Sequence, residues 1–306
     1  MKNHSLAFCI LAHDDPAMLR RLVAALCPHS VLIHWDKRAP ALPPETLSDL
    51  DHATVLAKRT DIHWAGFGMV EATAALLEEM QNQGLADHTI LLSGHCYPAR
   101  PLGELADYLS CHRGKDVIQS YPVHPGSALW NLIGRKWRME PYLSDTLRRF
   151  APIGAIAEFV RKVRNRIARI VGREIAKELD GAAVHHGASW WALSPASVET
   201  VLQRFRAEPQ WRSAFRSCFA SDELTFHSIL ANSDRAEKRI GPSEDKGGRS
   251  IYDAPLHHVA TEPGRWLTDS VETRQAIRAS RKFFVRKIRS SDSGLLDWLD
   301  RRRLAA

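Results

Sequence analysis

Two groups that could act on a sugar lie within residues 187–230. Trp190 and Trp191 begin a strand-like run and offer flat apolar faces to a sugar ring. Further along, Ser221 precedes residues 222–230 (DELTFHSIL), a run typical of a helix. This order predicts that Ser221 is the N-cap and that Glu223 lies in the first turn. The positive end of a helix would keep this carboxylate ionised, so that it could accept a proton from a sugar hydroxyl. Alternatively, this acid is an ordinary helix-start residue and the tryptophans belong to the core.

The elements that must position such groups begin at the N-terminus. Residues Leu6–Ala12 read as a first strand, and a helix with an aspartate at its cap follows from about Pro16 to Leu26. A second strand, Ser30–Trp35, ends in Asp36. In a doubly wound α/β sheet, ligands bind at the carboxyl ends of the strands. Asp36 could therefore accept hydrogen bonds from a ribose or a uracil ring, and an exposed turn aspartate is the alternative.

Small residues then approach the same edge. Residues 63–69 form a turn punctuated by glycines, which precedes a predicted helix from Val70 to Gln83 and would let backbone N–H groups reach a ligand. A buried strand is expected over residues 88–92, with residues 93–98 as the loop at its carboxyl end. A short strand over residues 116–120 completes this half.

Composition narrows the class of protein. The 306 residues are 44% apolar and 25% charged, as in an ordinary globular protein, and no window is apolar enough for a membrane span. The apolar N-terminus reads as a strand and not as a signal peptide, because no cleavage site of small residues follows it. Five cysteines, an odd number without CxxC spacing, indicate neither a disulfide framework nor a zinc cluster and fit a reducing cytoplasm.

The net charge of +7 is concentrated in residues 148–177, where basic residues alternate with apolar ones spaced three and four apart. This pattern predicts an amphipathic basic helix. Such a helix could lie on an anionic membrane surface. Equally, it could cover the core and expose its basic face to water. No nucleic-acid partner is expected, because no binding motif accompanies the charge.

Five blocks together resemble one family, the core-2/I-branching β-1,6-N-acetylglucosaminyltransferases and peptide O-xylosyltransferases. In chain order the blocks are residues 8–13 (FCILAH), 33–37 (IHWDK), 64–73 (WAGFGMVEAT), 91–98 (LLSGHCYP), and 187–194 with 221–230. The resemblance implies an α/β fold of the GT-A type, with a central mixed sheet flanked by helices. It also implies inverting transfer of a sugar from a UDP-sugar donor, without a metal.

The resemblance assigns roles to individual residues. Glu223 matches the general base, and Asp36 would hold the nucleoside with the backbone near His13. Lys287, in residues 284–288 (FVRKI), matches the family's closing motif and would neutralise the diphosphate, with Arg249 as a second cation. A surface cation is the alternative for both. The residues expected at the sugar or acceptor are Trp64, Ser93, Gly94, Trp190 and Trp191.

A metal is not expected from the residues either. Asp49 and Asp51 have the Asp-x-Asp form but follow prolines, away from a strand end, and read as a solvated helix start. The pairs at residues 185–186 and 257–258 are adjacent histidines, which point apart in a strand. One departure from the family is Cys96, where many members have an aspartate, and it leaves the donor sugar open between N-acetylglucosamine and xylose.

These observations give one overall hypothesis. Residues 1–140 form a nucleotide-sugar half, residues 141–180 the basic helical segment, and residues 181–306 an acceptor and catalytic half with a basic C-terminal tail, all within one GT-A domain. The chain resembles a bacterial cytoplasmic member that builds surface or capsular polysaccharide on a glycan or lipid-linked acceptor, peripherally at the inner membrane. The alternatives are a catalytically silent glycan-binding relative and a membrane-surface assembly protein.

Overall fold

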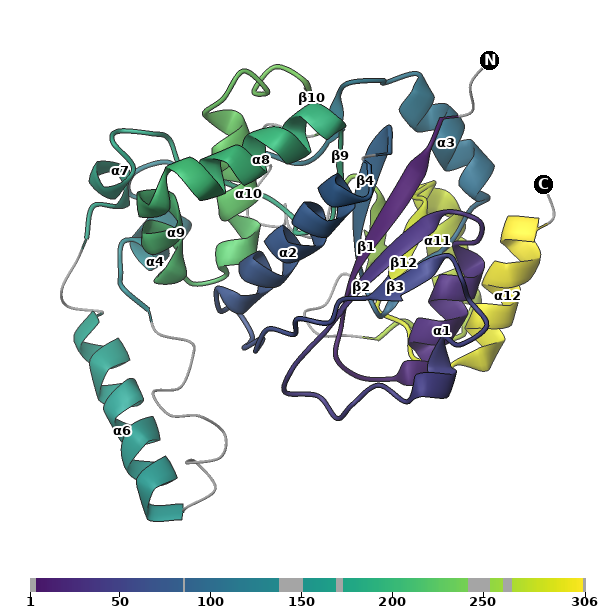
Figure 1. The fold of residues 1–306 in the computed structure, drawn as a ribbon, viewed down its shortest axis with the longest axis horizontal. Helices are drawn as coiled ribbons and strands as arrows, with labels where there is room; N and C mark the ends of the chain where they lie inside the picture. Colours follow the sequence, from purple (N-terminus) through teal and green to yellow (C-terminus); the bar gives the residue numbers. More distant parts are fainter. Residues whose placement is uncertain are drawn as a thin grey trace.

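The computed structural model describes residues 4–84, 86–137, 151–168, 173–241, 254–260 and 266–304. Within them a seven-stranded mixed sheet runs through the molecule (Figure 1). In sheet order its strands are β10 (Arg239–Ile240), β6 (Asp116–Val117), β9 (Ala192–Leu193), β4 (His88–Ser93), β1 (Leu6–Ala12), β2 (Ser30–Trp35) and β3 (Ala53–Val55). Strands β4, β1, β2 and β3 are parallel, whereas β9 is antiparallel to both of its neighbours.

The central strand β1 carries the core of both layers. All seven of its residues are buried, and successive side chains of a strand point to opposite faces. Phe8 and Ile10 accordingly pack into one apolar cluster, and Cys9 and Leu11 into the other. Because both faces are buried, the strand reads as a continuous apolar run.

Helices cover each face of the sheet, as Figure 1 shows. The first cluster includes residues from α1 (Pro16–Ala25), α3 (Leu102–Ser110), α11 (Val271–Ser280) and α12 (Ser293–Leu304). The second includes residues from α2 (Gly68–Asn82), α4 (Ala128–Ile133), α7 (Ile175–Glu178), α8 (Pro195–Ala207), α9 (Pro209–Arg216) and α10 (Thr225–Ala231). The expected α/β class, with a central mixed sheet flanked by helices, is confirmed.

A smaller sheet joins distant parts of the chain. It contains β11 (His257–Val259), β12 (Phe284–Arg286) and β5 (Cys96–Pro98), and β12 pairs antiparallel with β5. A third sheet consists of two strands, β7 (Tyr121–Pro122) and β8 (His185–His186). Since β5 follows β4 directly, β12 is placed beside the carboxyl end of the main sheet.

Local signals explain several element boundaries. Asp15 caps α1 by accepting a hydrogen bond from the backbone N–H of Met18 at 3.1 Å, and Pro16 occupies the first helical position. The strand expected over residues 116–120 is shorter, because only Asp116–Val117 pairs with neighbours. Asp49 lies in a turn, not a helix start, and pairs with Arg20 at 2.6 Å.

The basic segment is divided into helices. Residues Ala151–Ala168 form α6, which projects from the body in Figure 1, and Ile175–Glu178 form the separate α7. A short 3-10 helix, η1 (Pro44–Thr46), lies between β2 and β3 in the sequence. None of the described helices combines the length and the apolar character that crossing a bilayer requires.

Candidate functional site

A cavity of about 390 Å³ lies where three parallel strands end. Ala12 at the end of β1 pairs with Trp35 of β2, and Leu11 pairs with Ser93 of β4. This register brings the loops after the three strands together. We call this space the first cavity. Its lining includes His13, Asp14, Asp36, Trp64, Ser93, Gly94, His95, Trp190, Trp266, Arg286 and Lys287.

Asp36 is fixed in the wall of the first cavity. It is buried, and its Oδ1 accepts hydrogen bonds from the backbone N–H groups of Arg38 at 2.9 Å and Ile62 at 3.1 Å. These bonds hold the carboxylate in one orientation, which suits it to accept a hydrogen bond from a ligand. The alternative of an exposed turn aspartate is wrong.

Two cations line the same cavity: Arg286, the last residue of β12, and Lys287, which follows it. Lys287 is half-buried, and burial lowers its pKa, with the neighbouring Arg286 adding to the effect. Two features hold Arg286: its Nε donates to Ser93 Oγ at 3.0 Å, and its guanidinium lies 4.2 Å from the ring centre of Trp190. Two cations therefore converge on one wall of the first cavity, and the sequence analysis proposes a role for Lys287 but none for Arg286.

Glu223 lines a second cavity, of about 380 Å³. It ends the 3-10 helix η2 (Ser221–Glu223), and its backbone carbonyl accepts a hydrogen bond from the N–H of Gly187 at 3.0 Å. Asp222 also lines this cavity, and its Oδ2 accepts a bond from Ser189 Oγ at 2.6 Å. The two segments of the fifth sequence block, residues 187–194 and 221–230, are thus in contact.

The charge state expected for Glu223 is wrong. Ser221 Oγ is buried without a hydrogen-bond partner, so it is no N-cap, and the α-helix starts at Thr225. The pKa of Glu223 is raised to about 8, mainly by burial and also by the adjacent Asp222, while Arg286 acts in the opposite direction. Desolvation of the carboxylate outweighs any stabilisation by the following helix.

The two cavities share a wall. Trp64, Met69, Trp190, Arg286 and Lys287 line both. A molecule in the first cavity and another in the second would therefore meet beside the two cations and near Glu223. This arrangement can hold two reactants in contact, with fixed positive charge on one and a carboxyl group on the other.

Of the three tryptophans predicted at the substrate, two line the cavities and one does not. Trp190 lines both cavities, and Trp64 is 78% exposed at their mouth, edge-to-face with Phe219. Trp191 is fully buried and packs on Phe226 with ring centres 5.7 Å apart. The placement of Trp191 at the substrate is therefore wrong, because its side chain is part of the core and lines neither cavity.

Residues 93–96 support the shared wall. A Cβ on Gly94 would lie 3.0 Å from Ala12 Cβ, so glycine permits the close approach of two strand ends. Cys96 is buried, and its Sγ accepts a hydrogen bond from the backbone N–H of Ser93 at 3.3 Å. Cys96 pairs with Arg286 across β5 and β12 and lines neither cavity. Its influence on a ligand would pass through Arg286.

One group in the described part of the chain has the atoms for a metal site: His13, Asp14 and His95. His95 is fixed, since its Nδ1 lies 3.0 Å from the carbonyl of Ile288 and its Nε2 lies 2.6 Å from Asp14 Oδ1. His13 Nε2 is 3.4 Å from the same oxygen. The 2.6 Å contact is a direct hydrogen bond between His95 and Asp14. Neither adjacent histidine pair belongs to this group.

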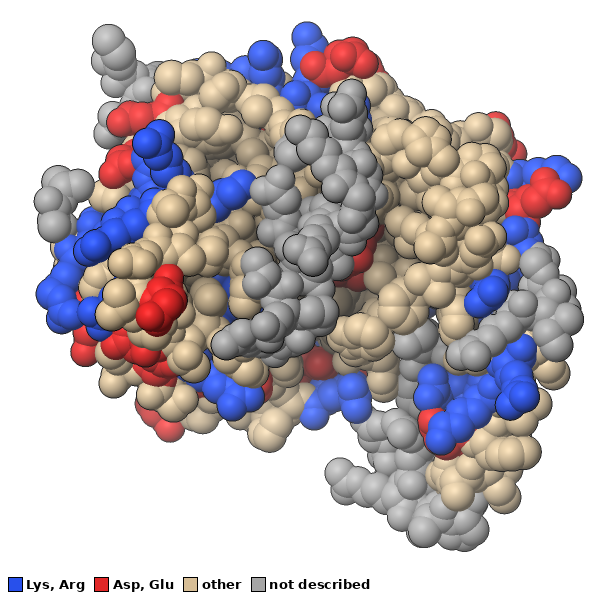
Figure 2. Space-filling view, turned by 180° about the vertical axis from the view of Figure 1, so that it is seen from behind, with Lys and Arg blue, Asp and Glu red and all other residues tan. Residues whose placement is uncertain are grey.

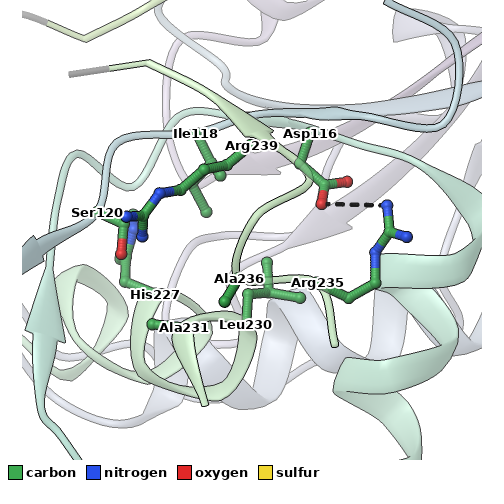
Figure 3. A pocket seen from close by; sticks show the side chains of 9 residues that line it. All are labelled: Asp116, Ile118, Ser120, His227, Leu230, Ala231, Arg235, Ala236 and Arg239. Carbon is green, nitrogen blue, oxygen red and sulfur yellow. Dashed lines mark ion pairs between the residues drawn. The ribbon is translucent and has the colours of Figure 1, made fainter. Parts of the chain in front are cut away.

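A further cavity, shown in Figure 3, lies between β6, β10 and α10. Asp116 and Arg235 form an ion pair at 3.6 Å on one side of it, and His227 lies on the other. Its volume of about 10 Å³ is the size for one water molecule. It is too small for a sugar.

Several site residues were missed by sequence reasoning. Asp14, His95, Asp222, Trp266 and Arg286 line the cavities but were not selected. A usable signal existed for Arg286, because a charged residue inside a short apolar strand needs a buried partner. Arg249, predicted as a second cation, lies outside the described residues.

Comparisons with known proteins agree on one family. A model of the Core-2/I-branching enzyme family matches residues 6–243. Xylosyltransferase 2 of Canis lupus familiaris is 25% identical over 246 residues, which cover 77% of this chain and 25% of that protein. Xylosyltransferase 2 of Rattus norvegicus is 24% identical over the same coverage. The chain thus spans about a quarter of the length of these curated relatives.

Two solved structures are more distantly similar. A putative glucose-1-phosphate thymidylyltransferase from Bacillus anthracis, in complex with a sucrose, has a TM-score of 0.36 and 8% identity, over 79% of this chain and 87% of that one. Mannose-1-phosphate geranyltransferase from Thermus thermophilus has a TM-score of 0.30 and 12% identity, over 76% and 66%.

Proposed function

This chain belongs to the Core-2/I-branching enzyme family, and from that premise we propose that it is an inverting glycosyltransferase of the GT-A type. It moves N-acetylglucosamine or xylose from a UDP-sugar to a hydroxyl of a glycan. The observation that carries the proposal is the wall shared by two cavities, with Asp36 on one side, Glu223 on the other and two cations between them.

The donor occupies the first cavity. Asp36, held by two backbone N–H groups, accepts a hydrogen bond from the nucleoside. Lys287 and Arg286 neutralise the diphosphate as the bond to the sugar breaks, so its developing charge is stabilised by fixed groups. Lys287 lies beyond residues 6–243, so its role rests on the cavity geometry and on the 284–288 motif.

The acceptor occupies the second cavity. Its hydroxyl attacks the anomeric carbon opposite the departing diphosphate, and Glu223 takes the hydroxyl proton. Trp190 forms an apolar floor common to both sugars. The acceptor is a glycan or a lipid-linked saccharide, in the synthesis of a bacterial surface polysaccharide at the cytoplasmic face of the membrane.

Transfer should depend on pH through Glu223. We expect kcat/KM to rise with pH and to level off above about pH 8, because burial raises the pKa of Glu223 to about 8 and only its ionised form accepts a proton. Asp222→Asn removes a neighbouring negative charge and should move the midpoint to lower pH. The measurement is a pH–rate profile of both chains, with the exposed Asp51→Asn as control. A native profile without a rise would exclude Glu223 as the base.

Donor binding should not require a metal. We expect calorimetry to give the same UDP affinity in EDTA as with added manganese, because Lys287 and Arg286 already supply positive charge. Asp14→Asn, which removes the negative charge from the one candidate metal group among the described residues, tests the opposite case. Binding that EDTA abolishes, manganese restores and Asp14→Asn prevents would replace the metal-free proposal with a metal at His13, Asp14 and His95.

A further inference from the structure

Helix α6 exposes an apolar stripe to solvent. The residues of this stripe are Ile156, Phe159, Val160, Val163 and Ile167. Their spacing of three and four places them on one side of the helix. Phe159 is 67% exposed and Ile156 64%, so the described part of the chain leaves the stripe uncovered. An apolar patch of this kind on a projecting helix indicates a surface that binds another body.

Basic side chains border the stripe. At about 3.6 residues per turn, Arg164 falls along one edge and Arg166 along the other. Both are exposed, as is Lys162 beyond Arg166. Figure 2 shows Lys and Arg side chains gathered over α6 at the lower right of that view. The only acid of α6, Glu158, lies away from the stripe in an ion pair with Arg161 at 2.6 Å.

This charge pattern selects among occupants of the stripe. A second copy docking α6 against α6 would bring cationic borders next to cationic borders, which like-charge repulsion disfavours. An anionic lipid surface instead offers phosphates to the borders and acyl chains to the stripe. Long arginine and lysine side chains can reach the headgroups while their stems stay in apolar surroundings.

We propose that α6 docks this protein on an anionic lipid bilayer, with the helix in the plane of the interface, the apolar stripe of α6 among the upper acyl chains and its basic borders at the lipid phosphates. Helices of this composition lie within the headgroup boundary, and each nearby cation strengthens attraction to anionic lipid. None of the stripe residues lines either cavity. Docking is therefore separable from transfer.

The experiment uses the full chain and vesicle flotation. Vesicles of phosphatidylcholine alone are compared with vesicles that contain about one-third phosphatidylglycerol, at low salt and at about 1 M salt, where exposed charges are screened. We expect partition into the anionic vesicles to be at least about tenfold stronger than into neutral ones, and to fall at high salt. Equal partition into both vesicles, or none into either, would overturn the proposal.

Two double variants test the contributions of the apolar stripe and of its basic borders separately. Phe159→Ser with Val163→Ser removes apolar contact, and Arg164→Glu with Arg166→Glu reverses the border charge. Each should weaken partition at least about tenfold. Val271→Ser on α11 is the matched control, because Val271 is 64% exposed far from α6 in the sequence, and it should bind like the native chain.

Folding and self-association are checked on the same samples. UDP affinity and the thermal midpoint should be unchanged in the α6 variants, which shows that a lost partition is not a lost fold. A native dimer that the serine variant converts to a monomer in light scattering would assign the stripe to a second copy and overturn lipid docking. Loss of UDP binding in the native chain would count against the proposed function but not against docking.

Discussion

A Glu223→Gln chain is expected to transfer sugar about 10²- to 10⁴-fold more slowly than the native chain, the range typical of a lost general base. Glutamine has the shape of the buried carboxyl but cannot accept the acceptor's proton. UDP affinity should stay within a few-fold, because Glu223 lines the second cavity and not the first. Single-turnover transfer and UDP calorimetry measure the two effects. Transfer that survives in this variant would remove Glu223 from the mechanism.

The same substitution should raise the free energy of unfolding at alkaline pH. Burial raises the pKa of Glu223 from 4.5 to about 8, so between these values the native state holds a proton that the unfolded state has released. The free energy of unfolding therefore falls as the pH rises through this window, and the full cost is present above pH 8. Replacing the group should recover up to about 5 kcal/mol at high pH, the cost that corresponds to raising the pKa from 4.5 to about 8, and little below pH 4.5.

Urea unfolding of native and variant chains at both ends of the window measures this gain. The exposed Glu45→Gln is the matched control and should change neither stability nor transfer. A variant that is slower and also less stable at high pH would show that Glu223 holds the fold. A base that costs stability is typical of a site selected for its chemistry.

Lys287→Met is expected to weaken UDP binding at least about 30-fold, because removing one partner of a partly buried charge pair costs about 2–5 kcal/mol. Methionine retains most of the apolar stem of Lys287, so the wall it forms with Trp266 should persist. Arg286 remains in the variant, so some affinity for diphosphate should also remain. Calorimetry with UDP and with uridine separates the charge effect from nucleoside recognition.

Uridine should bind both chains equally, since it carries no diphosphate. The exposed Lys177→Met, which removes a cation paired with Glu174, is the matched control and should bind UDP like the native chain. Equal loss of uridine and UDP would show that Lys287 shapes the cavity instead of neutralising the diphosphate.

Local patterns were sufficient for the elements that form the first cavity. The strands Leu6–Ala12 and Ser30–Trp35 have the predicted bounds, because a run of apolar residues buried on both faces leaves little choice of structure. Asp36 was found because a polar residue directly after such a strand falls at the sheet edge. The cap of α1 also follows from residue types alone.

The second cavity depended on contacts between distant residues. Ser221 has the type of an N-cap, but tight packing of η2 against residues near Gly187 gives a 3-10 turn in which its hydroxyl is buried. The raised pKa of Glu223 arises from burial, which no local pattern reports. Arg286 faces the site because β12 pairs with β5, a contact between residues 286 and 96.

The pairing of β12 with β5 also sets when the site can first exist during synthesis. Asp36 and the loop after β4 leave the ribosome early, whereas Arg286 and Lys287 are made much later. A growing chain that stops before residue 284 has Asp36 and the loop after β4 but lacks the two cations of the first cavity. Under the proposed function, such a nascent chain could not hold a nucleotide sugar firmly or transfer its sugar, so the donor would be consumed only after residue 287 has been made.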